Sequence, residues 1–165
     1  MDEDTRWLTA EERAAWVRLL AVVELLPGVL DSQLRRDAGL SNFEYHVLAM
    51  LSEAPERTRR MSSLAAQTNA TLPRLSNVVR RLEDRGLVER FTPPDDLRAS
   101  DVRLTEAGWE KVTATAAGHV THVRQNVIDA LTPDQLTQLT AVADAILARI
   151  DPHGAAAGRP SGQAS

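Results

Sequence analysis

The sequence contains no cysteine. Disulfide scaffolds, cysteine-ligated zinc or iron–sulfur sites and thiol-based redox sensing are therefore excluded. Aromatic residues make up only 4% of the chain, too few for the stacking platforms on which some proteins bind single strands. No run approaches the roughly 18 apolar residues that span a membrane, and the first residues lack the basic start and apolar core of a signal peptide. We expect a cytoplasmic protein that does not engage a membrane.

The composition that remains is that of an ordinary globular protein. A chain of 165 residues fits one domain with its own core. Hydrophobic residues make up 43% and charged residues 25%, both within the usual range for soluble domains. Because aromatics are scarce, an aliphatic and mainly α-helical core is predicted.

The distribution of charge says more than its sum. The net charge of −4 by itself argues against a nucleic-acid partner. Between residues 57 and 103, however, ten arginines stand against six acidic residues, which gives +4 and leaves −8 for the rest of the chain. A basic middle suits contact with phosphate, and acidic ends suit contact with another protein. Lys111 is the only lysine, and guanidinium groups favour bidentate contacts to phosphate and guanine.

Helix starts are marked by capping boxes, in which Ser or Thr is followed three residues later by Glu or Gln. Usable boxes occur at Thr9/Glu12, Ser41/Glu44 and Thr132/Gln135. Within the first helix Pro27 should produce a kink, because proline removes a backbone hydrogen bond. Residues 151–165 are rich in Ala, Gly, Pro and Ser and are expected to be a disordered tail. The apolar spacing predicts helices over about 10–36, 41–53, 61–67, 71–84, 105–130 and 133–150.

The middle of the chain predicts a helix-turn-helix followed by a wing. A short helix, a turn at 68–70 and a second helix with a polar and basic outer face form the helix-turn-helix pattern. Residues 87–91 and 101–104 predict two short strands of a β-hairpin. Arg74 and Asn77 lie near the start of the second helix, where arginine suits guanine and asparagine suits adenine. The alternative is a solvated face of a helical bundle. The expected DNA contacts are Thr71, Arg74, Ser76, Asn77, Arg80 and Arg81.

Four stretches together resemble the MarR family of winged helix-turn-helix transcription regulators, over about residues 9–150. They are Met61-Ser-Ser-Leu-Ala-Ala, Arg81-Leu-Glu-Asp-Arg-Gly-Leu-Val88, Asp95-Asp-Leu-Arg98 and Leu104-Thr-Glu-Ala-Gly108. The resemblance implies a homodimer that reads a pseudo-palindromic DNA operator, with a small-molecule effector often bound between the dimerisation region and the reading heads. It assigns 1–8 to an N-terminal extension, about 57–104 to the reading head, and about 9–36 and 105–150 to dimerisation helices.

The wing departs from the family pattern at one position. The family usually has two arginines after the aspartate, whereas this chain has Leu97 followed by Arg98. Only Arg98 is therefore carried over as a DNA contact at the wing tip. An ion pair of Arg98 with Asp95 or Asp96, which would stiffen the hairpin, is an alternative compatible with that role.

Other residues are weaker candidates for a site. Trp16 and His46 are candidates for the effector pocket, although packing in the dimer or near the cleft also explains them. His119 and His122 lie three residues apart, but no cysteine or acidic cluster completes a metal-ligand set, so structural or surface roles are expected. No catalytic set, cofactor motif or metal site is predicted.

The sequence thus predicts a homodimeric DNA-binding regulator, a repressor that a small molecule releases from its operator. The alternative is a winged-helix module for protein interaction or small-molecule binding that does not regulate DNA.

Overall fold

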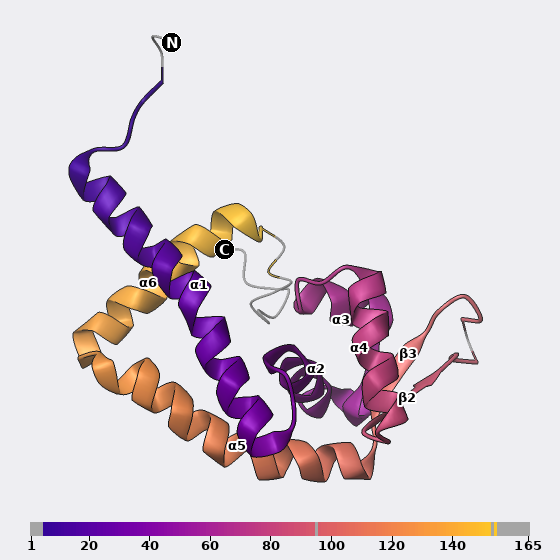
Figure 1. The fold of residues 1–165 in the computed structure, drawn as a ribbon. Helices are drawn as coiled ribbons and strands as arrows, with labels where there is room; N and C mark the ends of the chain where they lie inside the picture. The colour runs from indigo at the N-terminus through magenta and orange to yellow at the C-terminus, as the bar shows by residue number, and fades with distance from the viewer. Residues whose placement is uncertain (1–4, 95, 153, 155–165) are drawn as a thin grey trace.

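The computed structural model describes residues 5–94, 96–152 and 154, and the chain is mainly helical with one small sheet (Figure 1). A lobe of short helices and strands lies to one side of the long helices, and the long helix over Glu106–Asn126 runs beneath it (Figure 1). The helices are α1 (Ala10–Ala38), α2 (Asn42–Ser52), α3 (Met61–Gln67), α4 (Leu72–Asp84), α5 (Glu106–Asn126) and α6 (Pro133–Ile150). The strands are β1 (Thr58–Arg60), β2 (Val88–Phe91) and β3 (Asp101–Leu104), and 3₁₀ turns occupy Pro55–Arg57 and Ile128–Ala130.

The three predicted capping boxes are confirmed, at the starts of α1, α2 and α6. In α2, Ser41 Oγ accepts from the Glu44 backbone N–H at 3.1 Å, and Glu44 Oε2 accepts from the Ser41 N–H at 2.8 Å. Local sequence therefore fixes where these helices begin. Helix α1 continues through Pro27 and ends at Ala38, two residues beyond the predicted end. Gly39, which follows, adopts the left-handed conformation with φ 64°.

The predicted hairpin is part of a larger sheet. Strands β2 and β3 pair antiparallel as expected, but β1 also pairs with β3, so the strand order is β1-β3-β2. The sequence Thr58-Arg59-Arg60 has no alternation of apolar and polar residues, so no local pattern marks it as a strand. Its extended backbone is stabilised by pairing with β3, which lies more than forty residues away in the chain.

The predicted fifth helix is too long. Helix α5 ends at Asn126, and Val127 leaves the helical region with φ −130° and ψ −64°. The Asn126 amide donates to the His122 carbonyl at 2.8 Å, and such side-chain bonds compete with the helical ladder. The chain must also become extended at Thr132 to cap α6, so a 3₁₀ turn replaces the last helical turn that was expected.

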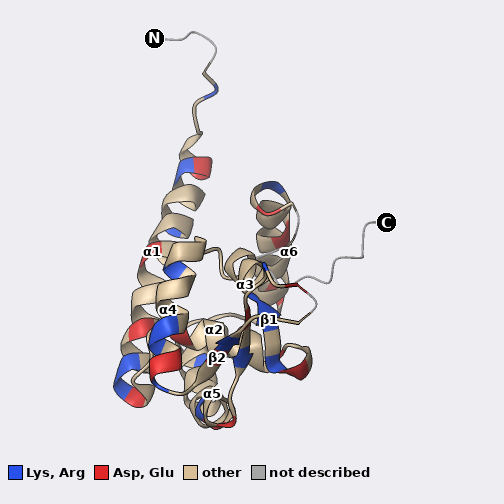
Figure 2. Ribbon diagram, turned by 90° about the vertical axis from the view of Figure 1, so that its right-hand side faces the viewer, with Lys and Arg blue, Asp and Glu red and all other residues tan. Residues whose placement is uncertain are grey.

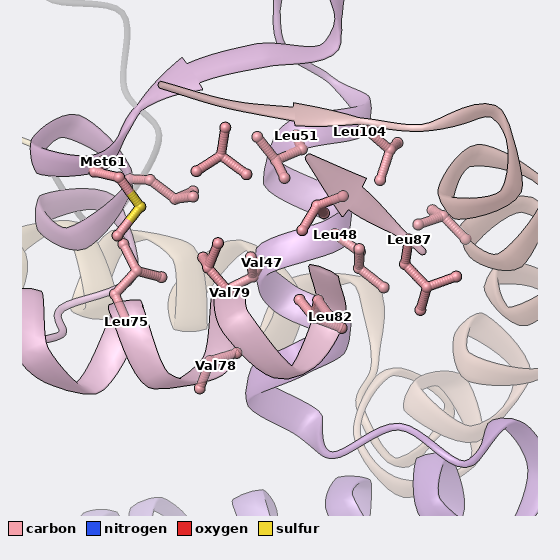
Figure 3. Close-up of a cluster of buried hydrophobic side chains, with 14 of the residues drawn as sticks. Val47, Leu48, Leu51, Met61, Leu75, Val78, Val79, Leu82, Leu87 and Leu104 are labelled. Atoms are coloured by element: carbon pink, nitrogen blue, oxygen red, sulfur yellow. The ribbon is translucent and has the colours of Figure 1, made fainter. Parts of the chain in front are cut away.

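The main hydrophobic core lies in the lobe formed by α2, α3, α4 and the sheet. Figure 3 shows aliphatic side chains of these elements pointing toward one another. Helix α2 contributes Val47, Leu48 and Leu51, and α5 contributes Val112. The packed lobe therefore extends beyond 57–104 at both ends. Helix α4 packs one face on this core and exposes the other to solvent, and it lies next to β2 of the sheet.

Helices α1 and α6 leave apolar faces uncovered within the single chain. No described residue of α6 is buried, and α1 buries only Gln33 and Leu34. Long stretches of α1 carry no charge (Figure 2). None of the described helices is long and apolar enough to cross a membrane. The exposed large side chains of these helices include Trp16, Val17, Val22, Val23, Leu25, Leu139, Val142 and Ile150.

Candidate nucleic-acid interface

Helix α4 presents its polar face to solvent. The Thr71 hydroxyl caps the helix by accepting from the Arg74 backbone N–H at 3.4 Å. On the inner face Leu75, Val78, Val79 and Leu82 are buried in the core. Because residues three, four and seven apart share a face of a helix, the remaining side chains form three stripes. One faces α2, one faces outward, and one faces the wing formed by β2, β3 and the loop between them.

The stripe that faces α2 contains two arginines held by neighbouring residues of that helix. The guanidinium carbon of Arg74 lies 4.4 Å from the centre of the Phe43 ring, within the range of a cation–π interaction. The Arg81 Nε donates to Glu44 Oε1 at 3.3 Å, and Arg85 Nη1 lies 3.9 Å from Glu44 Oε2. Helix α2 therefore limits the directions in which Arg74 and Arg81 can point.

Glu44 is a buried anion beside this stripe. Burial raises the pKa of its carboxyl, but hydrogen bonds from Ser41 and Arg81 outweigh burial, so the pKa lies below its ordinary value. The carboxylate consequently remains charged and compensates part of the positive charge of Arg81 and Arg85.

The outward stripe carries Asn77 and Arg80. Both side chains are exposed, and Arg80 Nη2 donates to Asn77 Oδ1 at 3.3 Å. This bond leaves the Asn77 amide N–H₂ and most of the Arg80 donors directed to the surface. A groove of about 410 Å³ runs beside them, between α4 and the junction of α1 with α2. It is lined by Asp31, Arg35, Ser41, Phe43, Arg74, Asn77, Val78 and Arg81.

The third stripe is tied to the wing. Ser76 is half-buried, and its hydroxyl accepts from Arg90 Nη1 on β2 at 3.2 Å. The same arginine binds Glu83 of α4 through Nη2 at 3.3 Å, and its backbone N–H donates to Glu83 at 3.1 Å. These bonds fix the orientation of β2 relative to α4.

At the tip of the wing, Arg98 and Leu97 are exposed. Asp96 binds Arg60 of β1 at 3.1 Å, and it accepts the backbone N–H of Arg98 at 3.2 Å. Among the residues that the structure describes, the Arg98 guanidinium has no ion pair with Asp96. Asp95, the other partner considered for Arg98, lies outside the described residues.

Comparison with known proteins agrees with this geometry. The family model described as "MarR family" matches residues 40–100. The crystal structure of Sco3205 from Streptomyces coelicolor, a MarR family transcriptional regulator in complex with DNA, is 41% identical, covers 92% of this chain and 94% of that chain, and superposes with a TM-score of 0.86. AbsC of the same organism, also a MarR family transcriptional regulator, is 39% identical over 90% of this chain and 97% of that chain, with a TM-score of 0.81.

The chain belongs to the MarR family. A curated relative, the uncharacterized HTH-type transcriptional regulator YdcH of Bacillus subtilis, is 40% identical over 65 residues. That match spans 39% of this chain and 43% of YdcH, less than half the length of either protein.

In this MarR protein the predicted DNA contacts fall into two groups. Arg74, Asn77, Arg80 and Arg81 are exposed on α4, and Arg98 is exposed at the wing tip. The hydroxyls of Thr71 and Ser76 are already engaged within the protein. Figure 2 shows basic and acidic residues interspersed over α4 and the strands, so the basic middle of the chain is not a uniform positive surface.

The residues that position these contacts had no clear signal in the sequence. Glu44 was identified only as a helix cap, and its partner Arg81 is 37 residues away. Phe43 is only partly buried against the core, and it also contacts Arg74. Arg60 and Arg90 were counted as part of the basic region, but both serve ion pairs inside the lobe.

The candidate effector residues remain apart in the single chain. Trp16 is 51% exposed on α1, and His46 is exposed on α2. No hydrogen bond or ring contact joins these two within the described part of the chain. Their role in a ligand pocket stays a prediction.

The two histidines of α5 have different surroundings. His119 packs against Tyr45 with ring centroids 4.6 Å apart, and its Nδ1 lies 3.4 Å from Gln33 Oε1. Burial lowers the pKa of its imidazole, and the charge of nearby His122 lowers it further. His122 has a buried Nε2 with no hydrogen-bond partner among the described residues. Those residues include no cluster of three potential metal ligands.

Proposed function

We propose that this protein is a homodimeric regulator that binds double-stranded DNA by placing α4 in the major groove and the wing on the flanking backbone or minor groove. The observation that carries the proposal is the position of Arg74, Asn77 and Arg80. They are exposed on a helix whose opposite face is packed in the core, and the Arg98 wing tip lies in the same lobe. The 41% identical Sco3205 was crystallised with DNA, which supports this mode of binding.

The homodimer is supported by the uncovered apolar faces of α1 and α6. Apolar side chains exposed over this much of two helices mark an interaction surface. A two-fold dimer formed through that surface would present two α4 helices to one duplex. Half-sites would then be about 34–36 Å apart, so the operator is a pseudo-palindrome.

We further propose that binding represses transcription and that a small molecule releases the protein. A cavity of about 420 Å³ between α1 and α5, lined by polar groups including Gln33, Asp37 and His122, supports a ligand between the dimerisation helices. Trp16 and His46 do not line this cavity, and they are tested separately, by substitution, as the candidate ligand contacts that the sequence predicts. Transcription in vitro from the promoter upstream of the protein's own gene, with and without the protein, distinguishes repression from activation.

Two measurements test DNA binding. Footprinting on the DNA upstream of the gene should reveal a protected pseudo-palindrome. Binding to that duplex should weaken steeply as salt rises, with a log–log slope of about −0.9 for each phosphate neutralised. Arg124→Ala is the control variant. It removes an arginine outside the lobe, which is exposed on α5 and pairs with Asp129, so duplex binding and its salt slope should match those of the wild type. A chain that retains no duplex even at low salt would instead be a protein-interaction or small-molecule-binding module.

A further inference from the structure

Exposed large hydrophobic side chains outside the proposed dimerisation helices are rare among the described residues. Apart from the N-terminal segment, α1, α5 and α6, they are Leu72, which is 52% exposed, and Leu97, which is 82% exposed. Leu72 occupies the first turn of α4 and Leu97 the tip of the wing. Both positions are those that a winged helix presents to DNA.

The first turn of α4 has few free polar groups of its own. The Thr71 hydroxyl is used to cap the helix. The hydroxyl of Ser76, which shares a face with Leu72, accepts a hydrogen bond from Arg90. Leu72 and Pro73 remain, and both are exposed and apolar. The hydroxyls near the start of α4 are therefore held by contacts within the protein, and the exposed apolar surface of its first turn is that of Leu72 and Pro73.

Apolar side chains do read one feature of the major groove. The 5-methyl group of thymine projects there, and it is recognised by contact with an apolar side chain. We infer that Leu72 is a specificity-determining residue that packs against a thymine methyl group in each half-site of the operator. This inference rests on the proposed function, since it requires α4 to lie in the major groove.

Contact with a methyl group predicts a defined operator composition. A thymine should occur in each half-site next to the bases contacted by Arg74 and Asn77, which lie two and five residues further along α4. Removal of that methyl group alone should weaken binding, although base pairing and the other groove atoms are unchanged.

The test uses the full chain and a duplex selected with it from a random-sequence pool. Each thymine of the half-sites is replaced in turn, symmetrically, by deoxyuridine, which lacks only the methyl group, and affinity is measured by fluorescence anisotropy. At one position the replacement should weaken wild-type binding about fourfold for each half-site, which corresponds to the burial of one methyl group. At that position Leu72→Ala should bind the thymine and deoxyuridine duplexes equally.

Leu97→Ala is the matched control, since it removes the other exposed leucine of the lobe and should keep the full deoxyuridine penalty. The inference is overturned if wild-type protein tolerates deoxyuridine at every position, or if Leu72→Ala retains the penalty. Failure to select any duplex would overturn the proposed function as well, whereas tight binding without methyl dependence would overturn this inference alone.

Discussion

The Arg74 guanidinium lies over the Phe43 ring, with its central carbon 4.4 Å from the ring centre. The contact joins the helix that would read DNA to the helix packed beside it. An arginine held in this way loses less conformational freedom when it binds a base or a phosphate. Phe43 is therefore a positioning residue for the proposed interface.

Substitutions on α4 should change sequence specificity. Arg74→Ala and Asn77→Ala should each cost about 1–3 kcal/mol on the operator and less on random duplex, because each removes hydrogen bonds to a base edge. Phe43→Leu should weaken operator binding by about 0.5–1 kcal/mol through loss of the cation–π contact. Anisotropy with both duplexes measures these effects. Unchanged affinities in both Arg74→Ala and Asn77→Ala would exclude α4 as the reading helix.

Substitutions in the wing should change non-specific affinity instead. Arg98→Ala should weaken binding to all duplexes by a similar factor and reduce the salt slope by about 0.9, the effect of one phosphate contact. Leu97→Arg should tighten non-specific binding, since it adds a cation at an exposed tip. Titrations at several salt concentrations give the slopes. Identical slopes in the wild type and both variants would remove the wing from the interface.

Loss of α6 should abolish dimerisation. A chain truncated before Thr132 lacks the apolar face that includes Leu139, Val142 and Ile146, and it should sediment as a monomer and lose operator binding. Val142→Asp in the full chain should have the same effect, because it places a charge on that face. Thr137→Asp is the control, because Thr137 is exposed on α6 and is not three, four or seven residues from Leu139, Val142 or Ile146. A monomeric wild-type chain that binds one half-site as tightly as two would contradict the dimer.

Glu44 should make stability depend on pH. Its pKa is lowered in the folded state despite burial, by hydrogen bonds from Ser41 and Arg81, so the unfolded chain takes up the proton first as pH falls. The contribution to stability is complete above the ordinary glutamate pKa and is lost as pH falls through the lowered folded value. Glu44→Gln should lower the free energy of unfolding at pH 7 by about 1–3 kcal/mol and reduce the loss of stability in acid.

Urea unfolding at a series of pH values measures this dependence. Glu110→Gln is the control, because Glu110 is an exposed carboxylate on α5. A pH dependence as steep in Glu44→Gln as in the wild type would show that other groups are responsible.

Gly108 should tolerate no side chain. A Cβ atom there would lie 2.0 Å from the Leu87 carbonyl oxygen, which is backbone and also accepts the Thr105 N–H at 3.1 Å. Gly108→Ala should therefore destabilise the fold by about 1–3 kcal/mol or more, as overpacking does. Gly118→Ala, on the same helix, meets nothing closer than 3.9 Å and should stabilise it by about 0.5–1 kcal/mol. Thermal unfolding compares them, and equal melting temperatures would contradict the clash.

Much of the local architecture could be predicted from the sequence. Each capping box joins residues only three apart, so the starts of α1, α2 and α6 depend on neighbours in the chain. The spacing of apolar residues likewise predicts α3, α4 and the two strands of the wing, because the period of the pattern is the period of the element.

The tertiary structure decided what depends on residues far apart in the chain. Strand β1 has no pattern of its own and exists through pairing with β3. The hydroxyl of Ser76 was expected to face DNA, but it faces Arg90, 14 residues away. Arg81 is restrained by Glu44 and Arg74 by Phe43, and Leu72 remains exposed at the start of α4. Sequence determines which side chains a helix carries and where it begins, but contacts between elements determine how those side chains are oriented, because a hydrogen bond or ion pair made within the fold restricts the directions in which a side chain can point.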